Sequence, residues 1–139
     1  MVETYRSNCP VNLALEIIGD KWSLLIIRDM MFENKCYFRE FLQGEEKIAT
    51  NILADRLSKL EKEGIIRKSG DPEHKQKFIY RLTLKGIDLL PLILEMGIWS
   101  LKYQPVDTKK HKHATRLLHG GTEARSAVRK ELVRKNIQG

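Results

Sequence analysis

The amino-acid sequence predicts a mainly α-helical fold that carries one small β-hairpin, and three observations lead to this prediction. Apolar residues recur at helical spacing through most of the chain. A polar turn at 70–77 separates two short runs in which β-branched and aromatic residues alternate with basic ones, a pattern typical of a hairpin. The length of 139 residues, with 42% apolar and 31% charged residues, fits one folded domain with a terminal extension.

Two helices are predicted near the N-terminus. The first spans 10–18, and Pro10 begins it at a position where the missing N–H costs nothing. The second spans 21–32, with Asp20 as the expected N-cap. Because its apolar residues lie nearly all round the helix, we expect this helix at the centre of the fold, with Trp22 in the core.

A one-turn helix at 39–42 and a longer helix at 50–63 are predicted next. In the longer helix, Leu53, Leu57 and Leu60 follow the i, i+4, i+7 spacing of a single buried face. The opposite face is therefore expected to carry polar side chains, namely Asn51, Asp55, Ser58 and Lys62.

The hairpin strands are predicted at 65–69 and 78–82. A long apolar helix then runs from Thr83, its cap, to Tyr103, and Pro91 inside it should kink or divide it because proline removes a helical hydrogen bond. Residues 122–137 are expected to form a basic amphipathic helix.

Positive charge is concentrated in two segments of the chain, whose overall net charge is +7. Residues 47–85 hold ten Lys and Arg against five Asp and Glu, and residues 105–139 hold nine against three. Basic segments of this kind indicate a polyanionic partner, because Lys and Arg gain free energy by releasing condensed counterions from phosphates.

Two helices, a short turn, a further helix and a basic hairpin form the order of a winged helix-turn-helix. In that architecture the second helix of the pair enters the major groove, and the hairpin reaches over the neighbouring backbone. We therefore predict a recognition helix at 50–63 and a wing at 70–77 within a DNA-binding domain that spans 1–104. Residues 105–139 form a basic, helical C-terminal extension in this prediction.

The predicted recognition helix carries side chains suited to base edges. Asn51 can make the bidentate contact to adenine, Thr50 can meet a base edge or a phosphate, and Ala54 leaves room for a thymine methyl group. Asp55 either accepts from a cytosine amino group or orients a nearby cation. Arg56, on the flank of the buried face, suits a phosphate contact and an intraprotein ion pair equally. The predicted DNA-binding residues are Arg39, Lys47, Thr50, Asn51, Ala54, Asp55, Arg56, Ser58, Lys59, Lys75, Lys77 and Arg81.

A run of motifs in fixed order covers roughly residues 8–103. The motifs are Cys9-Pro10-Val11 and the segments 18–26, 38–41, 48–57, 60–66 and 80–86. Together they closely resemble the bacterial HxlR-type transcriptional regulators, relatives of the MarR group. The resemblance implies a homodimer in which the long helix after the wing forms much of the interface, and we expect the C-terminal helix to reinforce it. The expected function is that of a transcriptional regulator, in the first place a repressor, that binds a pseudo-palindromic double-stranded DNA operator.

Cys9 is a candidate redox sensor. In some members of the resembling family, a cysteine before Pro-Val senses oxidants or electrophiles. Cys9 also precedes the first predicted helix, where free N–H groups and the macrodipole stabilise a thiolate. The alternatives are a purely structural Cys9 and a small-molecule effector. Cys36 is expected to fill a small space in the core and is the only partner in the chain for a disulfide.

Other classes of protein are disfavoured. The sequence has no G-x-S-x-G, P-loop, GxGxxG or HExxH motif, so we predict no enzyme and no cofactor. The two cysteines lack the spacing of a zinc site, so no metal is predicted. No secretory signal and no apolar run near the ~18 residues of a membrane span are found, which predicts a cytoplasmic protein without a membrane partner. The alternative function is a winged-helix protein-interaction module that does not bind DNA, against which the basic wing with Lys75, Lys77 and Arg81 argues.

Overall fold

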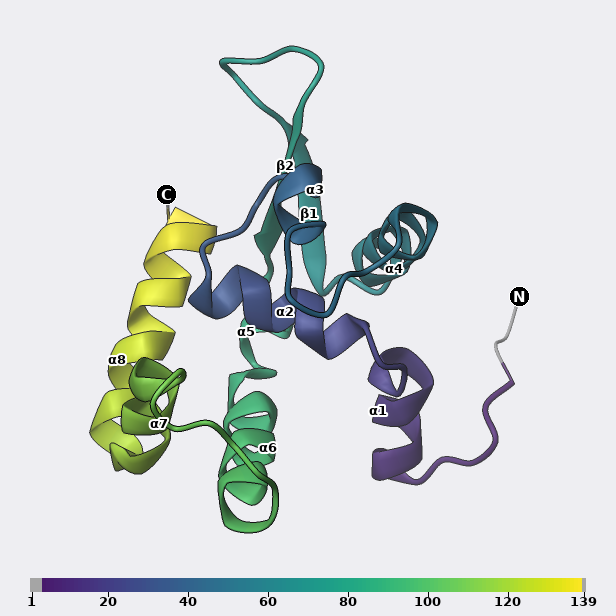
Figure 1. Ribbon diagram of the computed structural model, residues 1–139. Coiled ribbons are helices and arrows are strands. Elements are labelled where there is room, and N and C mark those ends of the chain that lie inside the picture. The colour runs from purple at the N-terminus through teal and green to yellow at the C-terminus, as the bar shows by residue number, and fades with distance from the viewer. Residues whose placement is uncertain (1–3, 139) are drawn as a thin grey trace. The chain divides into compact units, whose positions relative to one another are not determined.

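The computed structural model describes residues 4–138, which form helices and one two-stranded sheet (Figure 1). The chain divides into two compact units, residues 1–81 and 82–139. No helix among residues 4–138 is long and apolar enough to cross a membrane. The predicted division of roles between residues 1–104 and 105–139 stays a prediction.

The helices of the first unit lie close to their predicted positions. They are α1 (Pro10–Ile18), α2 (Ser23–Phe32), α3 (Phe38–Phe41) and α4 (Thr50–Lys62). Helix α2 begins two residues later than predicted, because the carboxylate of Asp20 accepts from the N–H groups of Trp22 at 2.9 Å and Ser23 at 3.0 Å. Residues 20–22 therefore form a capping turn that precedes the helix.

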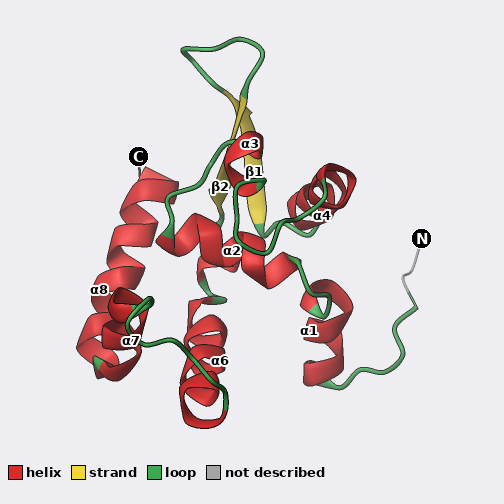
Figure 2. Cartoon of the chain, in the orientation of Figure 1, coloured by secondary structure: helices red, strands yellow, loops and turns green. Residues whose placement is uncertain are grey.

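The hairpin comprises β1 (Ile66–Gly70) and β2 (Phe78–Leu82), which pair with each other (Figure 2). Strand β2 lies where it was predicted, and β1 is shifted by one residue. Gly64 separates α4 from the hairpin with a φ of 73°, a left-handed conformation that favours glycine.

The core of the first unit joins α2, α3, α4 and the hairpin. The ring of Phe41 meets that of Tyr80 edge to face, with centroids 6.4 Å apart, so α3 packs on the wing strand β2. Trp22, predicted to be a core residue, is half-buried. The buried apolar residues of α2 and α4 are Ile26, Ile27, Met30, Met31, Leu53, Leu57 and Leu60.

The second unit is helical and contains the C-terminal extension. Its helices are α5 (Leu84–Ile87), α6 (Leu90–Tyr103), α7 (Lys112–His119) and α8 (Gly121–Val133), followed by the π-helical turn η1 (Arg134–Gln138). The long helix predicted after the wing is divided, and Pro91 stands in the first turn of α6, where its missing N–H costs nothing. The predicted helix 122–137 corresponds to α8 and η1, whereas α7 was not predicted.

Candidate nucleic-acid interface

Helix α4 has one buried face and one exposed polar face. Leu53, Leu57 and Leu60 are at most 2% exposed, so they fix the rotation of the helix about its axis. The other face leaves the following predicted contact residues exposed to solvent: Thr50, Asn51, Ala54, Asp55 and Ser58. No side chain caps the N-terminus of α4, so its first N–H groups and the positive end of its dipole face outward beside Thr50 and Asn51.

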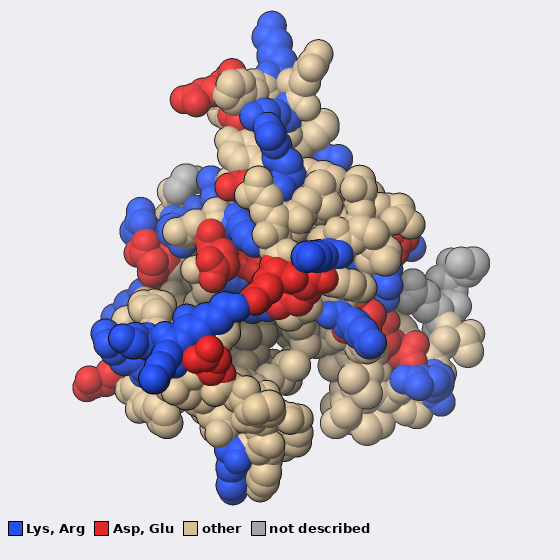
Figure 3. All heavy atoms as spheres, viewed as in Figure 1, with Lys and Arg blue, Asp and Glu red and all other residues tan. Residues whose placement is uncertain are grey.

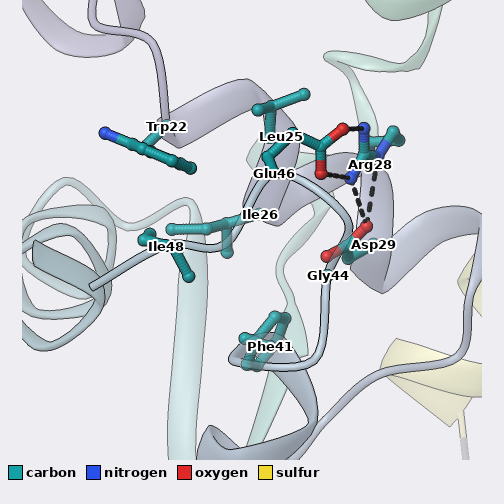
Figure 4. A pocket seen from close by; sticks show the side chains of 9 residues that line it. All are labelled: Trp22, Leu25, Ile26, Arg28, Asp29, Phe41, Gly44, Glu46 and Ile48. Carbon is teal, nitrogen blue, oxygen red and sulfur yellow. Dashed lines mark hydrogen bonds and ion pairs between the residues drawn. The ribbon is translucent and has the colours of Figure 1, made fainter. Parts of the chain in front are cut away.

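The turn that leads into α4 is tied to α2 by an arginine. Arg28 donates from Nη1 to Glu46 Oε2 at 2.9 Å and from Nη2 to Glu46 Oε1 at 3.0 Å (Figure 4). These hydrogen bonds hold the pKa of Glu46 down to about 2. The next residue, Lys47, has a left-handed φ of 58° and leaves its side chain exposed. The ion pair thus holds the turn through which the chain enters α4.

A hollow lies beside this ion pair, between α2, α3 and the turn before α4 (Figure 4). Apolar side chains of Trp22, Ile26 and Phe41 form part of its wall. Its charged groups satisfy one another, since buried Asp29 accepts from Arg28 at 2.8 Å and from Lys35 at 3.1 Å.

Arg56 makes ion pairs within the protein. Its Nε donates to Asp20 Oδ2 at 2.8 Å, and its Nη1 donates to Asp55. Burial acts to raise the pKa of Asp20, but the hydrogen bonds from Ser23, Trp22 and Arg56 outweigh it and lower that pKa to about 2. The sequence left two roles open for Arg56 and two for Asp55. In the structure Arg56 forms an ion pair within the protein, and Asp55 orients that same arginine.

Lys59 also has a protein partner, because its Nζ donates to the carbonyl of Glu16 near the end of α1 at 3.3 Å. This contact fixes α4 to the last turn of α1. Arg39, by contrast, is exposed on α3. Direct contact of DNA with any of these residues stays a prediction.

The wing is anchored at its base by Asp71. This carboxylate accepts from the Tyr37 hydroxyl at 2.8 Å and from the Glu73 N–H at 3.0 Å, and Asp71 itself is 8% exposed. The bond to Asp71 raises the pKa of Tyr37 to about 12. Lys77 lies with its Nζ 5.5 Å from the centroid of the Tyr37 ring. Lys75 and Lys77 are exposed, and Figure 3 shows basic side chains on the projecting loop.

The structure adds two exposed basic residues to the predicted wing, Arg67 and Lys68 on β1. Strict alternation would place one of them inward, but only Ile66 of β1 is buried, and Nζ of Lys68 lies 4.1 Å from the ring centroid of Phe78. Arg81, a predicted contact, is half-buried. The hydrogen bond between Tyr37 and Asp71 joins residues 34 positions apart, so no local sequence pattern predicts it.

The two cysteines differ in their surroundings. Cys9 is exposed at the N-terminus of α1, where the N–H groups of Asn12 and Val11 lower the pKa of its thiol. Burial raises the pKa of the half-buried Cys36 thiol. Cys9 is therefore the more acidic and more accessible thiol. Over residues 4–138, no three His, Cys, Asp or Glu side chains gather in a way that could hold a metal ion.

Comparison with known sequences gives a consistent family. The HxlR-like helix-turn-helix family profile matches residues 17–108. The chain is 35% identical to the HTH-type transcriptional regulator YdeP of Bacillus subtilis over 69% of this chain and 74% of YdeP. It is also 35% identical to the HTH-type transcriptional regulator YodB of B. subtilis, over 72% of this chain and 90% of YodB.

Solved structures show the same likeness. The reduced form of YodB from B. subtilis superposes with a TM-score of 0.58 and 32% identity, over 70% of this chain and 95% of YodB. The redox regulator HypR in its oxidized form gives a TM-score of 0.62 and 32% identity, over 70% of this chain and all of HypR, 100%. The winged-helix fold predicted from the sequence is thereby confirmed.

Proposed function

The chain belongs to the HxlR-like helix-turn-helix family of DNA-binding transcriptional regulators, and on this premise we propose that it acts as a homodimeric repressor. As a member of that family it is a regulator and not an enzyme. Its operator is a pseudo-palindromic DNA duplex. Helix α4 of each protomer occupies the major groove, and the wing contacts the neighbouring phosphates.

The observation that carries this proposal is the exposed face of α4 with its uncapped N-terminus. Asn51 lies near that end, where a carboxamide can bond both N6 and N7 of adenine. The free N–H groups of the first turn suit a backbone phosphate. The exposed Lys75 and Lys77 add phosphate contacts from a loop whose base is held by Asp71. Base readers and phosphate binders thus lie on adjacent elements of one unit.

The exposed apolar surface of α6 supports dimerisation, with a second copy of the chain as the partner. Leu92, Met96, Trp99 and Tyr103 follow i, i+4, i+7, i+11 spacing and are 40%, 49%, 55% and 61% exposed. The rings of Trp99 and Tyr103 lie 5.4 Å apart. Exposure of an apolar stripe of this size to water is unfavourable in free energy, and pairing across a two-fold axis would bury the stripes of both protomers against each other. Two recognition helices related in this way fit half-sites about 34 Å apart, or a multiple of that.

Regulation by a thiol at Cys9 is proposed as the effector mechanism. The accessible thiol with a lowered pKa supports it, as does the likeness to a protein named as the redox regulator HypR. An oxidant or electrophile is then the effector, and the regulator acts in the cytoplasm, where thiols are kept reduced until stress occurs.

Selection of bound duplexes from the source genome tests the proposal. Purified protein is incubated with fragmented genomic DNA at several salt concentrations, with and without diamide, and bound fragments are sequenced. The proposal expects a shared pseudo-palindrome among fragments retained under reducing conditions and its loss with diamide. A bound set without any shared sequence at every salt concentration would contradict the regulator and favour the protein-interaction module.

A further inference from the structure

The C-terminal extension carries a basic stripe on and just before α7. The stripe consists of Lys112, Arg116 and His119, whose i, i+4, i+7 spacing puts them on one face of α7, and of Lys109 in the turn before the helix. All four side chains are exposed. No carboxylate occurs in the sequence between Asp107 and Glu123, so nothing along this segment offsets the charge. The family match ends at residue 108, just before the stripe begins.

The fold orients this stripe outward. On the opposite side of α7, Leu117 and Leu118 are half-buried, and Leu118 packs against Gly97 of α6. A Cβ at Gly97 would lie 2.9 Å from Leu118 Cδ1, so glycine is what permits the close approach of the two helices. Helix α7 lies beside α6 in Figure 1. The apolar side of α7 is therefore fixed to the unit, and the basic side faces solvent.

The start of the stripe is ordered as well. The carboxylate of Asp107 accepts from the N–H groups of Lys109 and Lys110, each at 3.1 Å, and the Asp107 carbonyl accepts from the N–H of His111 at 3.1 Å. This turn leads directly into α7 and places Lys109 just before the helix. The cations are thus presented by a folded element, which lowers the entropy lost when a partner binds.

The cations of the neighbouring helix are arranged differently. Arg125 and Arg129 of α8 donate to Glu95 and Asp88, each at 2.9 Å, and Arg134 of η1 pairs with Glu131. Arg125 and Arg129 thus tie the extension to the rest of its unit, whereas Arg134 is paired within the extension. Within residues 4–138, by contrast, Lys109, Lys112 and Arg116 belong to none of the ion pairs of the structure. The extension therefore contains two sets of cations: the arginines of α8 and η1 are paired with carboxylates, and Lys109, Lys112 and Arg116 are not.

We propose that the α7 stripe is a second DNA-binding surface, which contacts backbone phosphates without reading sequence. This inference rests on the proposed function, because it enlarges the footprint of the same protein on the same duplex. An unpaired row of Lys and Arg with no base-reading amide beside it has the chemistry of a phosphate contact. Each neutralised phosphate releases counterions, so the stripe adds affinity for any duplex and leaves the choice of operator to α4.

Double-stranded DNA is favoured over other polyanions by the composition of the surface. Recognition of unpaired RNA bases uses stacking on aromatic rings, and the segment 105–120 contains no Phe, Tyr or Trp. A helix that binds membranes buries an apolar face in the lipid, but the apolar face of α7 is occupied by α6. A duplex needs only the exposed cations.

The test compares two full-length variants that each lose three positive charges. The stripe variant is Lys109→Gln/Lys112→Gln/Arg116→Gln, and the control is Arg125→Gln/Arg129→Gln/Arg134→Gln, whose residues are paired within the protein. A third variant, Lys109→Arg/Lys112→Arg/Arg116→Lys, keeps the charge. The dissociation constant for a 30-base-pair random-sequence duplex is measured by fluorescence anisotropy over a range of salt concentrations, and thermal unfolding checks that each variant is folded.

For the stripe variant we expect the slope of log Kd against log salt to become shallower by about 2.7, since three phosphate contacts are lost and each removes about 0.9. The control and the charge-keeping variant should retain the wild-type slope. Equal slopes in the stripe variant and the wild type would overturn the inference. In that case the proposed function still stands, provided that the wild type binds the duplex. A wild type that binds no duplex would refute the proposed function itself. The same variants are also titrated with single-stranded RNA and with vesicles containing phosphatidylglycerol. If the stripe variant loses affinity only for one of these and binds the duplex like the wild type, the assignment to duplex DNA is overturned.

Discussion

Asn136, three residues from the C-terminus, is hydrogen-bonded to the backbone of Leu82, which ends the wing strand β2. Its Oδ1 accepts from the Leu82 N–H at 3.0 Å, and its Nδ2 donates to the Leu132 carbonyl at 2.9 Å. Asn136 is 4% exposed and Leu82 is fully buried. The end of the extension is therefore built into the core of the second unit, and it satisfies a backbone group that would otherwise be buried without a partner.

The first prediction is that Asn136→Ala destabilises the protein. The substitution leaves the buried N–H of Leu82 without its acceptor, which costs about 1 to 3 kcal/mol. The free energy of unfolding is measured by urea denaturation, with the exposed Gln138→Ala as the control. A change below about 0.5 kcal/mol for Asn136→Ala, equal to that of a surface substitution, would show that the bond carries no net stability.

The second prediction concerns pH and Asp20. The pKa of Asp20 is lowered from 3.8 to about 2 in the folded protein. Its ionised form therefore stabilises the fold above pH 4, and this stabilisation is lost as the pH falls from about 4 to 2. We expect Asp20→Asn to lower the free energy of unfolding by about 1 kcal/mol at pH 7, after allowance for solvent screening.

The difference between the wild type and Asp20→Asn should shrink as the pH falls below 4. Other carboxylates, such as Glu46, titrate in both proteins and cancel from the difference. Urea denaturation at pH 7, 4 and 2.5 gives the three values. A difference that stays constant over this range would mean that the Asp20 carboxylate does not contribute through its charge.

The third prediction is that the protein is a dimer in solution and that Trp99→Glu makes it a monomer. A charge in the middle of the apolar stripe of α6 would be buried without a partner in the interface. Light scattering coupled to size-exclusion chromatography gives the mass in solution. Lys102→Glu, on the same helix but beside the stripe, should remain dimeric. A wild type that is monomeric at every concentration would refute the dimer.

The fourth prediction concerns the two thiols. Cys9 should react with iodoacetamide faster than Cys36 at pH 7, because its pKa is lowered and its side chain is exposed. Mass spectrometry of timed samples gives both rates. Diamide should abolish DNA binding by the wild type and leave Cys9→Ser unaffected. Identical responses of the two proteins would assign Cys9 a structural role.

Much of the fold follows from local patterns. The spacing of Leu53, Leu57 and Leu60 fixed the buried face of α4, since one apolar stripe has one way to face a core. Pro91 marked the division of the long helix, because proline fits a first turn and disrupts a later one. The polar turn at 70–77 located the hairpin that the structure contains.

The contacts between distant residues could not be predicted in this way. The bonds Tyr37–Asp71 and Asn136–Leu82 join residues 34 and 54 positions apart, and neither pair has a spacing that marks it. Helix α7 was missed because its few apolar residues give a short pattern beside many charges. From the sequence, a phosphate contact and an intraprotein ion pair were equally compatible with Arg56. The fold brings Asp20, 36 positions away, within hydrogen-bond distance of Arg56.

The most direct test of sequence-specific binding through α4 compares Asn51→Ala with Lys77→Ala on a selected operator and on a random duplex. Asn51→Ala should cost about 1 to 3 kcal/mol on the operator and almost nothing on random DNA, because a base contact is lost. Lys77→Ala should weaken both duplexes alike and make the salt slope shallower by about 1, because a phosphate contact is lost. Equal losses on both duplexes for Asn51→Ala would contradict base recognition by the exposed face of α4.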